Sequence, residues 1–323
     1  MSRGFASDAR NHGDVKADMN DFSTDLPLKP IDPPVTADAT PIGVALDASG
    51  HVARLKWHRL KRHRNDLVFT PRRLREGLLL GASMEVDLRV HADHGFVCLH
   101  DDTLDRETTG TGPVARASTG KLRQLSLRRD DGMPSDQKLV LLEDLAELAR
   151  ADAAAGATIQ LDLKENDAAI GDCTAEAFHR TIASIAGRCI LSGGDWRAVC
   201  RLADSVAGLR RGFDPCTDDT LDQLRDAADC RAFASEALAV APEAEMIYLD
   251  YRIVLKAAAL GIDLVAPFHA AGKAVDAWTL NTGHPDADEA LQRLVALRVD
   301  QITTDEPVVL QARFEACARS APL

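Results

Sequence analysis

Short runs with hydrophobic residues at every second position recur along the chain, separated by longer stretches in which hydrophobic residues repeat at helical spacing. The run 83–90 (Ser-Met-Glu-Val-Asp-Leu-Arg-Val) has Met, Val, Leu and Val at alternate positions, which predicts a β-strand. The preceding stretch 71–80 is rich in leucine and follows a threonine. We predict a helix there, with Thr70 as its N-cap and Pro71 in its first turn.

The alternation of strands and helices continues from about residue 50 to the end of the chain. Strands are predicted at 52–57, 83–90, 96–99, 158–164, 188–191, 207–211, 245–249, 274–280 and 301–303, and helices at 71–80, 142–155, 175–186, 195–202, 218–238, 253–259, 286–297 and 308–318. Eight or nine strands separated by helices indicate an α/β protein with a (β/α)8 TIM barrel. A doubly wound open sheet is the alternative, although no glycine-rich nucleotide-binding motif supports a nucleotide-binding version of it.

The first 45 residues differ from the rest of the chain. They are polar, contain four prolines between positions 27 and 34, and show no amphipathic period. We therefore expect residues 1–45 to form an irregular arm that is flexible or wraps the barrel. Residues 46–323 are expected to form the barrel as a single domain.

Composition and charge exclude several classes of protein. Hydrophobic residues make up 46 % of the chain, which is enough for a large core, and the net charge of −12 argues against a nucleic-acid partner. Neither a membrane-spanning run nor a secretory signal is visible, so we expect no transmembrane segment. The seven cysteines include no Cys-x-x-Cys pair, which favours reduced thiols and a cytoplasmic location.

Ionisable side chains are concentrated where the predicted strands end. Glu85 and Asp87 are two positions apart, so they share one face of their strand, and burying two such carboxylates is costly unless a cation compensates. The next predicted strand is followed at once by His100. Because a TIM barrel builds its active site at the C-terminal ends of its strands, we expect these groups to converge at one mouth. Other strands bring His58, Arg59, Asp162, Lys164, Trp278 and Asp305.

These motifs, in this order, resemble those of the glycerophosphodiester phosphodiesterase family. The family pattern is H-R-G, E-N-T, E-x-D, H-D followed by R-x-T-x-G-x-G-x-V, then E-x-K, W-T and T-D-x-P. The resemblance spans about residues 50–312, and the stretch 81–114 is its most specific part. The chain has His58-Arg59-Leu60, Glu85-Val86-Asp87, His100-Asp101, the stretch 106–114, Asp162-Leu163-Lys164, Trp278-Thr279 and Thr304-Asp305-Glu306-Pro307.

The resemblance implies a role for each of these residues. Glu85, Asp87 and Asp162 would bind one divalent cation, Mg²⁺ or Ca²⁺, with Mn²⁺ also possible, because such cations accept carboxylate oxygens. His58 and His100 would act as general acid and base. The phosphate would be held by Arg59 and Lys164, and Trp278 would form a wall for the alcohol.

The implied reaction is hydrolysis of a small-molecule or lipid-derived phosphodiester. A glycerophosphodiester would give an alcohol and a glycerol phosphate, either directly or through a cyclic phosphate, as part of lipid metabolism. Cleavage of a lysophospholipid or another phosphodiester on the same machinery is one alternative. A non-catalytic barrel that binds phosphate compounds is another, because two motifs are altered: Leu60 replaces a glycine, and Leu67-Val68-Phe69-Thr70 stands where E-N-T is expected.

Individual residues also have alternative interpretations. His63, in a second His-Arg pair, could be the first catalytic histidine in place of His58. Asp162, where the family has glutamate, could pair with Lys164 instead of a cation, and Trp278 could be a core residue. Asp305 is expected to cap the helix that begins near Pro307.

Overall fold

The computed structural model describes residues 41–48 and 50–320, which contain a closed barrel of eight parallel strands. The pairing of Lys56 with Ser83 and of Arg54 with Gln301 joins the first barrel strand to both of its neighbours and closes the barrel. The predicted TIM barrel is confirmed, and the open sheet is wrong. In order around the barrel, the strands are β2 (His51–Trp57), β3 (Ser83–Val90), β7 (Thr158–Leu163), β8 (Cys189–Gly193), β9 (Arg210–Phe213), β10 (Met246–Asp250), β11 (Ala274–Trp278) and β12 (Gln301–Thr304).

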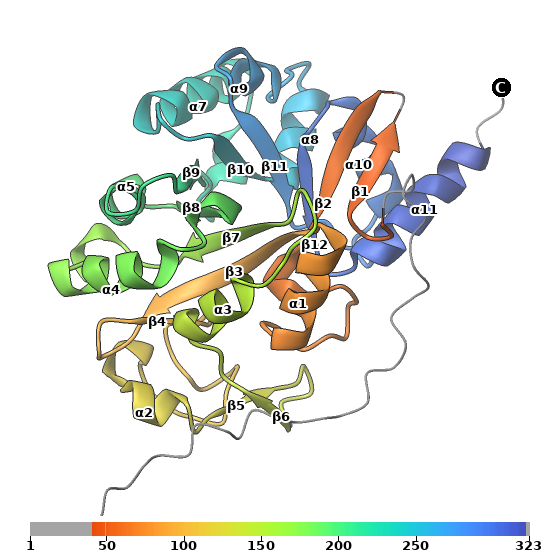
Figure 1. Ribbon diagram of the computed structural model, residues 1–323. Helices are drawn as coiled ribbons and strands as arrows, with labels where there is room; N and C mark the ends of the chain where they lie inside the picture. Colours follow the sequence, from red (N-terminus) through yellow and green to blue (C-terminus); the bar gives the residue numbers. More distant parts are fainter. Residues whose placement is uncertain (1–40, 49, 321–323) are drawn as a thin grey trace, which may run out of the picture. The chain divides into compact units, whose positions relative to one another are not determined.

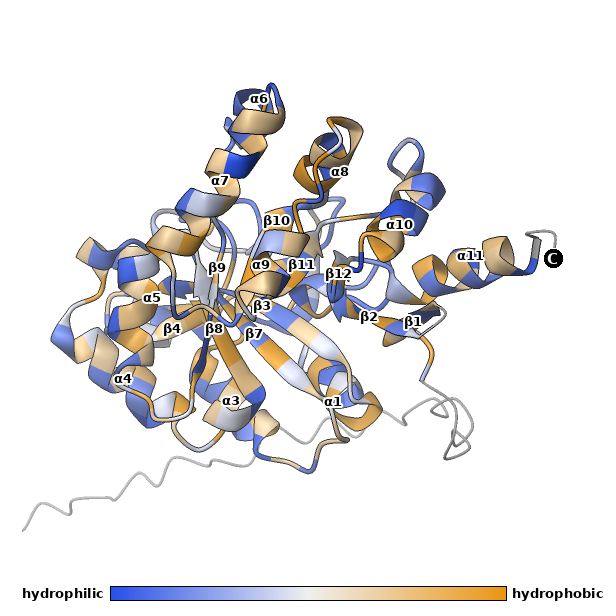
Figure 2. Ribbon diagram, turned by 90° about the horizontal axis from the view of Figure 1, so that it is seen from above, coloured by the Kyte–Doolittle hydropathy of each residue, from blue (hydrophilic) through white to orange (hydrophobic). Residues whose placement is uncertain are grey.

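Helices follow the barrel strands and surround them (Figure 1). Seen from above, strands β3 and β7 alternate between hydrophobic and hydrophilic residues, as expected for strands with two different faces (Figure 2). In chain order, the helices are α1 (Pro71–Leu80), α3 (Leu142–Ala149), α4 (Asp172–Ile182), α5 (Trp196–Ala203), α6 (Thr220–Gln223), α7 (Ala227–Val240), α8 (Tyr251–Ala259), α9 (Ala266–Ala270), α10 (Ala287–Ala296) and α11 (Pro307–Ser320).

The predicted start and end of α1 are confirmed. The side chain of Thr70 accepts a hydrogen bond from the backbone N–H of Arg73 at 3.4 Å, and Pro71 occupies the first turn. Gly81 ends the helix in a left-handed conformation, with φ of 71°. The chain then enters β3 directly, so the strand with the two acidic residues has a fixed starting point.

Four elements differ from the prediction. β1 (Ala45–Ala48) was not predicted; it forms an antiparallel hairpin with β2 that begins at the last residue assigned to the arm. β4 (Phe96–Cys98) pairs antiparallel with β3 and is not a barrel strand. The predicted helix 218–238 is divided into α6 and α7, because Asp226 caps a new helix. The predicted helix 142–155 ends early, at Ala149. Residues 1–40 of the predicted arm lie outside the described residues.

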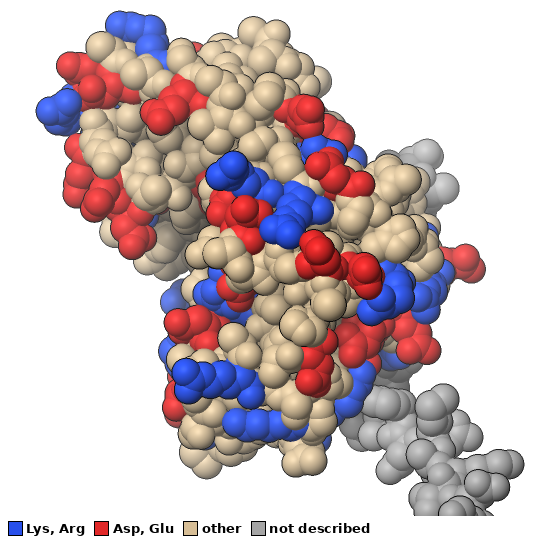
Figure 3. Space-filling model, turned by 90° about the vertical axis from the view of Figure 1, so that its left-hand side faces the viewer, with Lys and Arg blue, Asp and Glu red and all other residues tan. Residues whose placement is uncertain are grey.

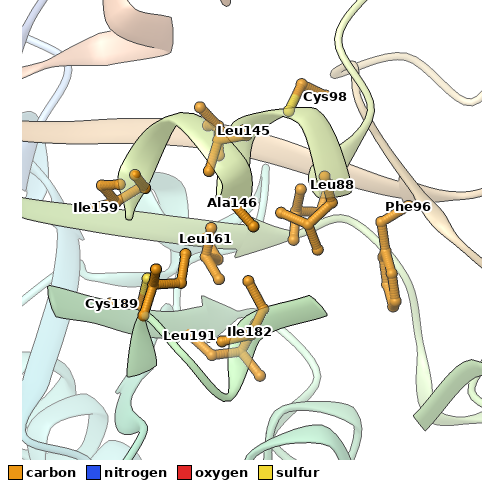
Figure 4. Packing of buried hydrophobic residues seen from close by; sticks show 14 of the residues in the cluster. Leu88, Phe96, Cys98, Leu145, Ala146, Ile159, Leu161, Ile182, Cys189 and Leu191 are labelled. Carbon is orange, nitrogen blue, oxygen red and sulfur yellow. The ribbon is translucent and has the colours of Figure 1, made fainter. Parts of the chain in front are cut away.

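The core between the barrel and its helices decides which side chains point inward. Met84, Val86 and Leu88 of β3 belong to the hydrophobic cluster that also includes residues of α1, α3 and α4. Figure 4 shows this packing, with Leu161 of β7 and Leu191 of β8 near Leu145 of α3 and Ile182 of α4. Because side chains alternate along a strand, Glu85 and Asp87 are directed to the interior of the barrel.

An insertion follows β4 and has a small core of its own. It contains α2 (Thr119–Leu122) and the hairpin of β5 (Ser126–Arg128) and β6 (Pro134–Lys138), which lie together at the lower edge of Figure 1. Its buried residues include Leu104, Val114 and Leu122. The insertion thereby supports the loop that starts at His100.

The distribution of surface charge and the hydrophobicity of the helices can be compared with the partners expected from the sequence. Acidic and basic side chains lie side by side on the face shown in Figure 3, so the acidic excess is not gathered in one patch there. None of the helices in the described part of the chain combines the length and hydrophobicity needed to cross a membrane.

Candidate active site

Three carboxylates of two neighbouring barrel strands meet inside the barrel. Strand β3 provides Glu85 and Asp87, and β7 provides Asp162, which is the direct register partner of Asp87. One carboxylate oxygen from each of the three lies within 4.8 Å of the others. Glu85 and Asp87 are only 3 % and 1 % exposed. The structure thus brings together the three residues that the sequence grouped as possible metal ligands.

The electrostatics of the three carboxylates fit a bound cation. Burial raises the pKa of Glu85 well above its usual value, and the charges of Asp87 and Asp162 raise it further. Burial also acts to raise the pKa of Asp87, but Lys164 and Arg59 outweigh it, so that this pKa is lowered. Oε1 of Glu85 is buried without a hydrogen bond from any described residue. An all-oxygen donor set with an unpaired buried oxygen suits Mg²⁺, Ca²⁺ or Mn²⁺.

Two basic side chains lie against these carboxylates. Nζ of Lys164 is 3.1 Å from Oδ1 of Asp87 and 2.5 Å from Oδ2 of Asp162, and burial, which acts to lower the pKa of Lys164, is outweighed by these carboxylates, which raise it. Nε of Arg59 is 3.0 Å from Oδ2 of Asp87, and the backbone N–H of Arg59 donates to Oε2 of Glu85 at 2.7 Å. The pairing of Asp162 with Lys164, which the sequence offered as an alternative to cation binding, is present within the carboxylate cluster. Arg59 and Lys164 thus lie directly against the carboxylate cluster.

His58 lies in a short 3-10 turn directly after β2. Its Nδ1 is 2.8 Å from Oδ1 of Asp305, which follows β12, and the other oxygen of Asp305 accepts from the side chain of Asn281 at 2.9 Å. Burial acts to raise the pKa of Asp305, but the bond to His58 and neighbouring groups lower it to about 2. Both oxygens of Asp305 are thus used to hold His58 and Asn281, and not to cap the following helix as the sequence suggested.

His100 reaches the site from a hairpin. After Val90 the chain turns back, and the backbone N–H of Leu99 donates to the carbonyl of Asp87 at 3.1 Å, which places His100 beside the acidic strand. Nδ1 of His100 is 3.0 Å from Oδ1 of Asp101. Arg106 donates to both oxygens of Asp101, at 2.6 and 2.7 Å, and this pairing lowers the pKa of Asp101 to about 2.

The loop after His58 departs from the family pattern at two residues that have positive φ. Arg59, Leu60 and Phe69 all have positive φ, at 51°, 60° and 53°. Leu60 stands where the pattern has glycine, and Phe69 where it has asparagine, which are the residues that adopt this conformation most readily. The side chains of Leu60 and Phe69 are buried, at 1 % each. Hydrophobic burial therefore accompanies a backbone that glycine or asparagine would adopt with less strain.

The two remaining candidates differ in their positions. His63 is exposed, and its backbone N–H donates to Asp66 at 2.8 Å. Trp278 ends β11 at the mouth and is half-buried, and its indole N–H is buried without a hydrogen-bond acceptor among the described residues. Its role as a wall of the site stays a prediction.

Sequence reasoning missed several residues of the site. Asp101 and Asp305 were quoted within motifs but not recognised as the partners of the two histidines. Ser192, fully buried on β8, donates to Oδ1 of Asp162 at 2.9 Å and had no motif to mark it. Asp214 follows β9, and burial together with Asp162 raises its pKa to about 7. An acidic residue directly after a barrel strand was the available signal for Asp214.

Comparison with known proteins agrees with this geometry. The model of the "Glycerophosphoryl diester phosphodiesterase family" matches residues 74–309. The chain belongs to this family. A curated protein of Mycobacterium tuberculosis (strain CDC 1551 / Oshkosh), "Probable glycerophosphodiester phosphodiesterase 1", is 37 % identical over 71 residues, which are 20 % of this chain and 26 % of that protein. The chain thus matches about a quarter of the length of this family member.

Solved structures of the family share the fold. A glycerophosphodiester phosphodiesterase from Agrobacterium tumefaciens str. C58 has a TM-score of 0.58 at 19 % identity, covering 80 % of this chain and 99 % of that chain. A phosphodiesterase from Oleispira antarctica, in complex with the product sn-glycerol-3-phosphate, has a TM-score of 0.58 at 16 % identity, covering 81 % and 96 %. At these identities the likeness shows the barrel fold of the glycerophosphodiester phosphodiesterases.

Proposed function

We propose that this protein is a phosphodiesterase that requires a divalent cation and hydrolyses glycerophosphodiesters to an alcohol and a glycerol phosphate. One observation carries the proposal: the cluster of Glu85, Asp87 and Asp162 lies at the same barrel mouth as two histidines, each paired with its own aspartate. The charges of both His58 and His100 act on the pKa of Asp87, so both histidines lie close to the carboxylate cluster. Membership of the family supports the same reaction.

The side chains divide the chemistry among them. A cation held by Glu85, Asp87 and Asp162 would neutralise the phosphate oxygens and so make the phosphorus open to attack. Arg59 and Lys164 add positive charge at the same place and orient the phosphate. In the structure they pair with carboxylates of the site, Arg59 with Asp87 and Glu107, and Lys164 with Asp87 and Asp162.

The two histidines are arranged for proton transfer. The aspartates bind Nδ1 of His58 and Nδ1 of His100, which leaves Nε2 of each ring for the substrate. One histidine takes the proton of the attacking hydroxyl or water, and the other donates a proton to the leaving alkoxide. The attacking group is either water or a neighbouring hydroxyl of the substrate, which would give a cyclic phosphate first.

The substrate belongs to the same proposal. The glycerol phosphate bound to the relative from Oleispira antarctica supports a small-molecule phosphodiester. Lysophospholipids and other phosphodiesters are the second candidates, favoured by the two altered motifs: Leu60 replaces the glycine of H-R-G, and Phe69 lies in the segment that replaces E-N-T. The two intact Asp–His pairs favour catalysis over a barrel that only binds phosphate compounds. A cytoplasmic location stays a prediction.

A substrate panel with controlled metal content tests the proposal. Purified protein is treated with EDTA and assayed on glycerophosphocholine, lysophosphatidylcholine and bis(p-nitrophenyl) phosphate after addition of Mg²⁺, Mn²⁺ or Ca²⁺. We expect turnover of glycerophosphocholine only with cation present. Absence of turnover on all three substrates with every cation would favour the binding barrel.

Single histidine variants identify the acid and base. His58→Ala and His100→Ala are each expected to lose roughly 100- to 10,000-fold in kcat, the usual contribution of a general acid or base. His63→Ala is the matched control on the exposed neighbour and should keep its activity. An active His58→Ala beside an inactive His63→Ala would reverse the assignment.

A further inference from the structure

The barrel interior below the carboxylate cluster contains a buried polar layer instead of the branched hydrophobic residues usual in this fold. Its residues lie on five different barrel strands and are each at most 5 % exposed: Lys56, Gln160, Ser192, Asp276 and Thr303. Lys56 and Asp276 form an ion pair at 3.2 Å, and Nζ of Lys56 also lies 4.4 Å from the ring centre of Tyr248. A buried ion pair is weak grounds for stability, because hydrophobic residues of similar size often serve as well.

The layer is connected to Asp162 by an unbroken chain of hydrogen bonds. The ammonium of Lys56 donates to Oε1 of Gln160. The amide Nε2 of Gln160 donates to the hydroxyl oxygen of Ser192 at 2.8 Å, and this hydroxyl donates to Oδ1 of Asp162 at 2.9 Å. The chain therefore runs from the Lys56–Asp276 ion pair to the rim of the site.

Lys56 fixes the donor-to-acceptor direction of these hydrogen bonds. An ammonium only donates, so Gln160 must turn its carbonyl oxygen to Lys56 and its NH₂ group to Ser192. Ser192 then receives a hydrogen bond at its oxygen and has only its own proton to offer to Asp162. Without Lys56 the amide of Gln160 could reverse, and Ser192 could donate to Gln160 and not to Asp162.

We propose that Lys56, Gln160 and Ser192 act as positioning residues that hold Asp162 in the orientation needed to bind the divalent cation. This inference rests on the proposed function. Asp162 needs such support because it is one methylene shorter than the family's glutamate and stands near the end of its strand. Ser192 holds one oxygen, and Lys164 pairs with the other, so the orientation of the carboxylate is set from two sides.

We call the hydrogen bonds from Lys56 through Gln160 and Ser192 to Asp162 the relay. A matched pair of variants, each lacking one buried hydroxyl, tests it. Ser192→Ala removes the buried hydroxyl that donates to Asp162. Thr303→Val removes a buried hydroxyl of the same layer that donates to Asp276 at 2.7 Å and lies outside the chain to Asp162. Lys56→Met removes the start of the relay without touching Asp162. The probe is Mn²⁺ alone, titrated into the EDTA-treated protein by calorimetry, with the thermal midpoint recorded with and without Mn²⁺.

We expect Ser192→Ala to weaken Mn²⁺ binding by about 10- to 100-fold, the usual effect of losing a residue that supports a metal ligand, and Lys56→Met to weaken it in the same direction. Thr303→Val should lower the thermal midpoint of the metal-free protein but keep the Mn²⁺ Kd within about twofold. At saturating Mn²⁺, kcat of Ser192→Ala should return to near the wild-type value, because the residue positions a ligand and does not react.

The outcomes separate this inference from the proposed function. Wild-type protein that binds Mn²⁺, together with a Ser192→Ala variant of equal affinity, overturns the relay and leaves the proposed function intact. An equal loss of Mn²⁺ affinity in Ser192→Ala and Thr303→Val also overturns the relay. Removing any hydroxyl from the buried polar layer would then weaken Mn²⁺ binding, whether or not it contacts Asp162. Wild-type protein that binds no divalent cation overturns the metal site and the relay together. If Lys56→Met does not fold, the comparison of Ser192→Ala with Thr303→Val decides.

Discussion

At the scale of single residues, side-chain burial stabilises the loop after His58 while its backbone conformation destabilises it. Leu60 and Phe69 have positive φ, where a side chain adds strain of about 1–2 kcal/mol per residue, yet both side chains are buried. Burying a leucine contributes roughly 1.5–3 kcal/mol, so the hydrophobic gain offsets the strain. This balance explains how the loop keeps its shape without the glycine and asparagine of the family pattern.

Replacing Leu60 tests this balance. Leu60→Ala should lower the free energy of unfolding by about 2–5 kcal/mol, as for other buried leucines. Leu60→Gly should be more stable than Leu60→Ala by about 1 kcal/mol, because glycine relieves the positive φ. At Leu74, buried within α1, the order should reverse, with glycine about 1 kcal/mol worse than alanine. Urea denaturation of the four variants measures both differences; the same order at both sites would contradict the argument.

Asp305 couples the orientation of His58 to pH. Because the pKa of Asp305 is lowered to about 2, below the value of the unfolded chain, the contacts of its carboxylate stabilise the fold above about pH 4, and this stabilisation is lost as the pH falls through 2. Asp305→Asn should reduce the free energy of unfolding at pH 7 by up to about 2 kcal/mol, and by less at pH 3. Denaturation at the two pH values measures this change.

The same variant should also lose activity. An amide at position 305 favours a different tautomer or orientation of His58, and the related change in the serine proteases costs about 10,000-fold in kcat. We expect a loss of at least about 100-fold for Asp305→Asn. Asp288→Asn, at a partly exposed ion pair with Arg313, is a control that should keep its activity. Full activity of Asp305→Asn would remove His58–Asp305 from the mechanism.

At the scale of elements, the partner and direction of a strand decide where its last residues lie. The sequence located Phe96–Leu99 as extended, but tertiary pairing made β4 the antiparallel partner of β3 and not a barrel strand. This hairpin returns the chain to the level of Asp87, and so brings His100 to the carboxylates. A parallel strand would have needed a crossover before delivering a residue to the same mouth.

The division of the predicted helix 218–238 also belongs to this scale. Asp226 accepts hydrogen bonds from the backbone N–H groups of Ala228 and Asp229, at 2.8 and 3.0 Å, and so starts α7. Asp226→Ala should therefore cost about 1 kcal/mol of stability, as typical for an N-cap. Asp222→Ala, within the short α6, should cost less than about 0.5 kcal/mol, as usual for a surface residue. Equal losses in thermal denaturation would show that the cap does not define α7.

At the scale of the whole molecule, the closed barrel brings together three carboxylates that would repel one another without nearby positive charge. Glu85, Asp87 and Asp162 come from two strands, and the mouth also holds Arg59 and Lys164. Positive charge from these residues, and from the proposed cation, is what makes the cluster tolerable inside the barrel.

Neutralising one carboxylate should therefore stabilise the metal-free protein. The pKa of Glu85 is raised in the fold, so its ionisation opposes folding, and the stability of the metal-free protein should fall as the pH rises through that pKa. Glu85→Gln should raise Tm by several degrees at pH 8 in EDTA but abolish the further rise that Mn²⁺ gives the wild-type protein. Differential scanning calorimetry with and without Mn²⁺ measures both; a less stable metal-free variant would contradict this account.

The sequence by itself determined the barrel class, the bounds of α1 and β3, and the grouping of Glu85, Asp87 and Asp162, because hydrophobic periodicity and acidic residues on strands can be recognised along the chain. It left His58 and His63 as alternatives for the first histidine. Only the tertiary structure decided that β4 turns back, that Asp101 and Asp305 hold the histidines, and that Ser192 supports Asp162. The physical reason is that hydrophobic periodicity does not record which side chains or strands pair: Asp305 and Ser192 act on residues 247 and 30 positions away, and even Asp101, next to His100, is oriented by its pairing with Arg106. The distant partners are chosen by the closure of the barrel, which no short stretch of sequence records.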